Sequence, residues 1–170
     1  LVGAVPVSGR TRWALFDAES DAFYVNIADP PEIAVLEAGC PDRVHRTIPI
    51  PAAGPHGLDL DPRSRRLFCA CDGKVLVALE PITGRVLGQT ALSGVPDVVF
   101  CNAALGHVYV AIGDPGVIDV FDTATLRRWV MHLDAARAAL GRTQLLRALE
   151  VGLLTGRRIS DLHRETDQRV

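Results

Sequence analysis

An internal repeat of 41 to 44 residues is the feature that most restricts the fold of this chain. Asp17, Asp61 and Asn102 mark equivalent points of its three copies, and they are spaced 44 and 41 residues apart. Each copy contains short runs of apolar or β-branched residues that are bounded by Gly, Pro, Asp and Asn. Such runs are typical of short strands joined by tight turns, and they lack the i, i+3, i+4 spacing of amphipathic helices.

The second copy shows the pattern most clearly, with four strand-like segments in succession. These segments are 55–61, 66–71, 75–79 and 85–90. A period of 40–45 residues with four strands per copy is typical of a β-propeller blade. We therefore predict an all-β partial propeller of about three four-stranded antiparallel blades over residues 1–132, followed by a short α-helical tail over 133–170. The blades are expected at about 11–54, 55–95 and 96–132.

Several segments also resemble a known repeat family. Residues 24–27 (Tyr-Val-Asn-Ile) and 109–112 (Tyr-Val-Ala-Ile) each lead through an Asp/Pro turn into a Val/Ile-rich strand, and 120–125 ends in an Asp-x-x-Thr step. Over roughly residues 11–131 the chain resembles the YVTN family of β-propeller repeats. The resemblance implies a bacterial propeller from a family that includes binding scaffolds, lactonase-like enzymes and haem-carrying domains. It also permits a periplasmic or secreted location, although no signal peptide is visible, so the compartment stays open.

Three blades are fewer than the four to eight that close a propeller. Because a blade buries its faces only against its neighbours, an arc of three leaves two apolar faces exposed. We expect one of three arrangements. The chain is a fragment of a longer propeller, or it forms a homo-oligomer that completes a ring, or its tail covers one open face.

Propeller ligands bind at the mouth of the central channel, where equivalent positions of successive blades converge. The innermost strands of the three blades begin at Arg12, His56 and Asp97. A cation, an imidazole and a carboxylate at one rim are suited to orienting a small polar ligand. The alternative is that all three are turn residues that face solvent or bind backbone.

The sequence contains none of the common hydrolase or phosphate-binding motifs, and we predict no catalytic residue, metal or cofactor. A calcium-dependent lactonase needs several carboxylates and an Asn at the channel. Asn102 and Asp97 are the local candidates for that role. The four cysteines do not have zinc-finger spacing, and Cys69 and Cys71 are expected to share one sheet face as buried free thiols.

The composition changes near residue 133, after which seven arginines stand against five acidic residues. The tail is rich in Leu, Ala and Arg, and Thr143 is placed to cap a helix with one apolar face. Residues 153–162 resemble the tyrosine-recombinase segment around its first catalytic arginine, which would be Arg158. A helix-turn-helix that contacts DNA phosphates is a further alternative. Against both stands an amphipathic segment that packs on a blade, or a fused sequence.

The interpretation best supported by these patterns is a non-catalytic propeller module that binds a small molecule or a protein. A lactonase-like propeller with catalytic groups in absent blades is the first alternative, and a DNA-associated protein is the second. The net charge of −2 gives no reason to expect nucleic acid as the main partner. No apolar run is long enough to span a bilayer.

Overall fold

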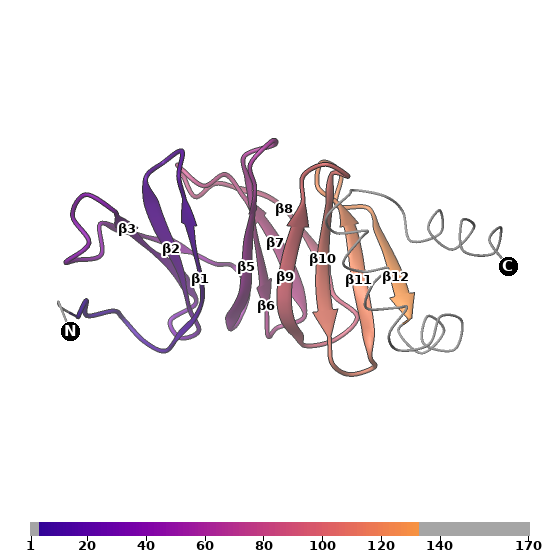
Figure 1. Cartoon of the computed structure of the whole chain (residues 1–170). Helices are drawn as coiled ribbons and strands as arrows, with labels where there is room; N and C mark the ends of the chain where they lie inside the picture. Colours follow the sequence, from indigo (N-terminus) through magenta and orange to yellow (C-terminus); the bar gives the residue numbers. More distant parts are fainter. Residues whose placement is uncertain (1–3, 133–170) are drawn as a thin grey trace, which may run out of the picture.

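A computed structural model describes residues 4–132, which form twelve β-strands and no helix. Figure 1 shows them following one another along the molecule in three groups of four. The strands are β1 (Thr11–Asp17), β2 (Ala22–Ile27), β3 (Glu32–Glu37), β4 (Arg46–Pro49), β5 (Pro55–Asp61), β6 (Arg66–Cys71), β7 (Val75–Leu79), β8 (Val86–Ala91), β9 (Pro96–Asn102), β10 (His107–Ile112), β11 (Val117–Asp122) and β12 (Arg128–His132).

Each group is a separate antiparallel sheet in which every strand pairs with the next one along the chain. We call β1–β4 blade 1, β5–β8 blade 2 and β9–β12 blade 3. The turn between the first two strands is the same in every blade. It ends on a residue with positive φ, which is Asp21 (49°), Arg65 (53°) or Gly106 (64°). The predicted all-β architecture of three four-stranded sheets is confirmed, whereas the predicted helical tail lies outside the described residues.

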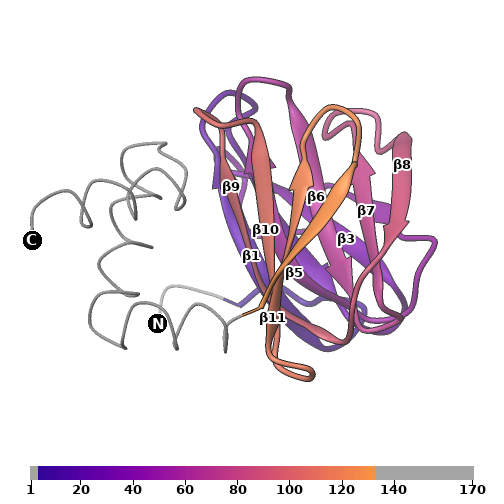
Figure 2. The same ribbon diagram turned by 90° about the vertical axis from the view of Figure 1, so that its right-hand side faces the viewer.

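The blades are stacked face to face around two apolar cores, and in the view of Figure 2 their strands lie one behind another. We call the side of each blade that points toward the next blade its forward face, and the opposite side its backward face. Tyr24 and Ile33 on the forward face of blade 1 pack against Leu67 and Leu79 on the backward face of blade 2. On its other side, blade 2 packs Phe68 into a second core with blade 3.

Blade 2 is therefore covered on both faces, which explains why β6 and β7 contain consecutive buried residues instead of an alternating pattern. Cys69 and Cys71 lie in β6 on the backward face, with their sulfur atoms 3.8 Å apart. They are buried and free, as the sequence predicted. The contact with the Cys71 thiol and burial raise the pKa of Cys69, so this side chain packs as a small apolar group.

Candidate functional site

The first strands of the blades, β1, β5 and β9, run side by side in Figure 1, and neighbouring pairs of them are in contact. Each of the three contains an irregularity near its start, where the register with the next strand shifts. These shifts fall at Arg12, His56 and Asp97, the three residues that sequence analysis placed at the channel rim. A β-bulge turns a side chain away from its regular direction and is common at rims and next to binding sites.

Arg12 of blade 1 and His56 of blade 2 meet across the seam between the blades. The Arg12 Nη1 atom lies 3.4 Å from His56 Nε2, and Nη2 lies 3.4 Å from Asp72 Oδ2. Asp72 completes the cluster, with its Oδ1 atom 2.7 Å from His56 Nδ1. The three side chains are 22%, 23% and 35% exposed, so the cluster is open to solvent on one side.

The chemistry of these groups determines the proton positions. Because a guanidinium group only donates, His56 Nε2 must accept from Arg12. The imidazole proton therefore lies on Nδ1 and is donated to Asp72. In this state the single positive charge of Arg12 is balanced by the single negative charge of Asp72. The Nε of Arg12 is buried and has no hydrogen-bond acceptor among the described residues.

The backbone of two turns places Asp72 beside His56. The amide N–H of Asp72 donates to the carbonyl of Gly54 (2.8 Å), which fixes the β6–β7 turn against the start of β5. Gly54 has a positive φ of 65°, and a Cβ atom there would lie only 2.8 Å from the Cβ of Asp72. Glycine is required at this position for both reasons.

Asn26, which is completely buried, holds the bulge of β5 from the neighbouring blade. Its Nδ2 donates to the backbone carbonyls of His56 (2.9 Å) and Gly57 (3.2 Å). The residues at the same position of β6 and β10 are Ala70 and Ala111, which cannot make such bonds. The seam between blades 1 and 2 is thus the one at which the bulge is held by a side chain of this kind.

We predict that Asn26→Ala lowers the free energy of unfolding by about 1–3 kcal/mol, because two buried carbonyls lose their donor. Asn26→Asp should lower it further, since a carboxylate would then face two carbonyl oxygens. Urea unfolding of the three proteins tests this order. Equal stability of the Ala and Asp variants would contradict the assigned orientation of the amide.

Asp97 and Asn102 do not join the cluster. The Asp97 side chain is exposed, and the described residues give it no hydrogen bond to Arg12 or His56. Asn102 is buried at the opposite end of β9, where its Oδ1 accepts from the amides of Ala104 and Leu105. The two candidates for a lactonase-like site therefore lie at opposite ends of one strand.

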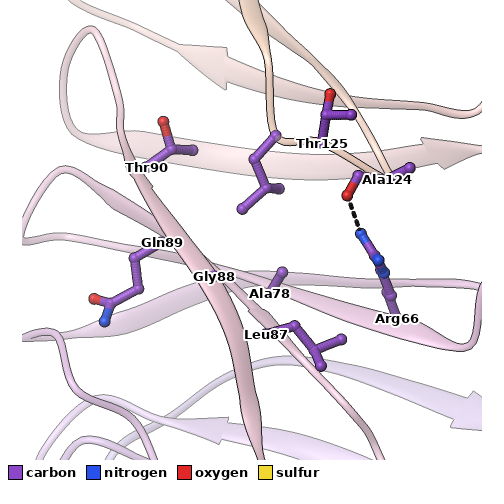
Figure 3. Close-up of a pocket in the computed structure, with 9 residues that line it drawn as sticks. Arg66, Ala78, Leu87, Gly88, Gln89, Thr90, Ala124 and Thr125 are labelled. Carbon is purple, nitrogen blue, oxygen red and sulfur yellow. Dashed lines mark hydrogen bonds between the residues drawn. The ribbon is translucent and has the colours of Figure 1, made fainter.

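A hollow lies between blades 2 and 3, beside the outermost strand of blade 2 (Figure 3). Its volume is about 350 Å³. Among the described residues that line it, Arg66 is the only charged one, and its Nη1 donates to the carbonyls of Thr123 (2.6 Å) and Ala124 (2.5 Å). Arg66 thus links blade 2 to blade 3 and is already hydrogen-bonded to backbone. The hollow therefore has fewer groups that could bind a polar ligand than the cluster of Arg12, His56 and Asp72.

Within residues 4–132, no group of three or more His, Cys, Asp or Glu side chains is arranged to hold a metal ion. The same residues include no helix that is long and apolar enough to cross a membrane. The cluster of Arg12, His56 and Asp72 combines a cation, an imidazole and a carboxylate.

Comparison with solved structures supports a β-propeller fold. The chain is similar to the β-propeller domain of Cps50 (Swd1) from Myceliophteria thermophila, with a TM-score of 0.60 and 12% identity over 74% of this chain and 39% of that one. It is also similar to Sqt1 from Saccharomyces cerevisiae (TM-score 0.64, 9% identity, 74% and 35% covered). A third similar structure is hydrazine synthase from Kuenenia stuttgartiensis (TM-score 0.60, 12% identity, 67% and 33% covered).

The chain thus spans between a third and two fifths of the length of these structures. At such low identity the similarity concerns the fold alone. Neither a protein-family model nor a curated protein sequence matches the chain. The propeller fold is established, and the more specific resemblance to YVTN repeats stays a prediction.

Proposed function

We propose that the chain is a non-catalytic binding module, part of a larger propeller, that holds a small ligand with a carboxylate or phosphate group at the channel mouth. The observation that carries this proposal is the meeting of Arg12, His56 and Asp72 across the seam of blades 1 and 2. Arg12 supplies a permanent charge with several donors, a geometry suited to oxyanions. Asp72 contacts both Arg12 and His56 and so positions the two groups.

The cluster contains no Ser, Thr, Cys or Lys side chain, and its imidazole contacts Arg12 through Nε2, which favours binding over hydrolysis. The separation of Asp97 from Asn102 gives no support to a lactonase-like reaction, and the proposed DNA contacts fall on residues 133–170, outside the described part. We also propose that the exposed faces of blades 1 and 3 are protein-contact surfaces, as suits a module of a propeller scaffold.

Titration with inorganic phosphate and with citrate, followed by NMR of the full chain, tests the rim site. Arg12→Ala should weaken binding at least tenfold, because it removes a charge-assisted hydrogen bond worth about 1.5–3 kcal/mol. Arg10→Ala removes an exposed arginine two residues away and is the matched control. Equal weakening by both substitutions would contradict a built site and indicate a general effect of charge.

A further inference from the structure

Aromatic side chains are concentrated on the two blade faces that no other blade covers. The chain has nine Phe, Tyr and Trp residues, and five of them lie on these faces. Phe16 (49% exposed) and Phe23 (41%) lie on the backward face of blade 1, with ring centroids 4.8 Å apart. On the forward face of blade 3 lie Phe100 (43%), Tyr109 and Trp129 (41%). Exposed apolar patches of this kind mark protein contacts.

The repeat shows what covers such faces, because Tyr109 and Phe23 have buried counterparts inside the chain. Tyr109 and Ile118 occupy the same strand positions in blade 3 as Tyr24 and Ile33 in blade 1, which are buried against blade 2. On the opposite side, Phe23 and Leu36 occupy the positions of Leu67 and Leu79, which receive Tyr24 and Ile33. The forward face of blade 3 therefore resembles the forward face of blade 1, which packs on blade 2. In the same way, the backward face of blade 1 resembles the backward face of blade 2.

The sizes of the side chains near the channel are complementary as well. Between blades 2 and 3, Gly57 faces Val99 so closely that a Cβ on Gly57 would lie 2.7 Å from Val99 Cγ2. The equivalent position on the open face of blade 3 is Val98, and the equivalent of Val99 in blade 1 is Ala14. In the pair between blades 2 and 3 the forward residue is the smaller one, whereas in the pair of Val98 and Ala14 the forward residue is the larger one. In both pairs a large side chain faces a small one, so the second pair also fits without a clash.

The charges at the other end of the seam also fit. Between blades 1 and 2, Asp17 at the end of β1 binds Arg65 in the first turn of the next blade. At the open faces, the corresponding residues are Asn102 and Asp21. An aspartate at 102, as at positions 17 and 61, would face the carboxylate of Asp21. Asn102 avoids this contact between like charges.

From these correspondences we infer that two copies of the chain close one six-bladed ring, in which blade 3 of each copy packs its forward face on the backward face of blade 1 of the other. This inference deepens the protein-contact part of the proposed function by naming the partner. A head-to-tail contact forms a closed ring only when the rotations that relate successive copies add to a full circle. Two arcs of three blades do so through a twofold axis along the channel, and six blades lie within the range of known propellers.

Paired charge variants of the full chain test this arrangement. Light scattering on a sizing column should give twice the 18.3 kDa chain mass for the wild type. Phe23→Lys and Tyr109→Glu should each give the mass of one chain, because each places an unpaired charge at both seams. An equimolar mixture should return to the mass of two chains, since lysine then meets glutamate at one seam and the other seam is native.

A wild-type chain of single mass, an open-ended ladder of masses, or a mixture that stays at single mass would each overturn the ring. Far-UV circular dichroism of both variants checks that the blades remain folded, as expected for substitutions on exposed faces. The mass measurement does not depend on ligand, so its failure is distinguishable from failure of anion binding at the rim.

Disulfide formation provides an independent test of the register. A mixture of Val98→Cys and Ala14→Cys chains should form a cross-linked pair under mild oxidation, because these residues face each other in the ring. Val98→Cys mixed with Glu19→Cys is the control, since the Glu19 side chain is 70% exposed in the turn at the other end of blade 1. Equal cross-linking of both mixtures would overturn the proposed register.

Discussion

Phe68→Ala is expected to lower the free energy of unfolding by about 3–5 kcal/mol, which is the usual range for removing a buried phenylalanine. Phe68 is completely buried in the core between blades 2 and 3, where it packs with residues of β7, β9, β10 and β11. Because each blade is stabilised only by its neighbours, a cavity at this seam loosens blade 3 from the rest of the arc. A marginally stable domain of this size would lose a large share of its stability.

Urea unfolding measured by tryptophan fluorescence checks this prediction. Trp129 lies in blade 3 and Trp13 in blade 1, so separation of the blades would appear as a broadened or two-step transition. Ile82→Ala is the control, because Ile82 is a large apolar residue that is 57% exposed in a turn of blade 2. A loss below about 1 kcal/mol for Phe68→Ala would contradict the burial that the structure gives this ring.

The repeat period and the short apolar runs were sufficient to predict the strands, because both depend on local sequence. The strand predicted at 85–90 is observed as β8 (Val86–Ala91), a shift of one residue. The shared face of Cys69 and Cys71 followed directly from the two-residue period of a strand. These features do not require knowledge of which blade contacts which.

The site was harder to predict because its geometry depends on contacts between blades. Arg12 and His56 were identified by their equivalent positions, whereas Asp72 lies in the turn between β6 and β7 and has no such signal. Its role follows from antiparallel order, which brings the β6–β7 turn to the same end of the blade as the start of β5. No sequence pattern indicated that Asn26 would hold the bulge of the next blade, since the equivalent residues of the other two copies are Ala70 and Ala111.

The ion pair between Asp17 and Arg65 leads to the second prediction with a large effect. Asp17 is only 5% exposed, and both of its oxygens accept from the Arg65 guanidinium, at 2.9 and 2.6 Å. Asp17→Asn should lower the free energy of unfolding by about 1.5–3 kcal/mol, the range for hydrogen bonds to charged groups. Asp61→Asn is the matched control, because Asp61 is equally buried and forms the same turn but has Gly106 in place of an arginine partner.

The same pair predicts how stability depends on pH. The Arg65 hydrogen bonds hold the pKa of Asp17 well below its ordinary value in the folded chain, and the bonds from Ser20 and the Glu19 amide act in the same direction. In the unfolded chain this pKa returns to about 3.9. A carboxyl whose pKa is lowered by folding stabilises the fold above its unfolded pKa, and this contribution is lost as the pH falls below about 4.

The wild type should therefore lose more stability between pH 6 and pH 3 than Asp17→Asn, in which the group no longer titrates. Other carboxyls with lowered pKa, at Glu80 and Asp122, are present in both proteins and cancel in the comparison. Urea unfolding at the two pH values measures the difference. Parallel loss in both proteins would mean that Arg65 does not stabilise the ionised form of Asp17. It would also remove the charge argument for asparagine at position 102, because that argument assumes that the residue ending the first strand faces the first turn of the next blade.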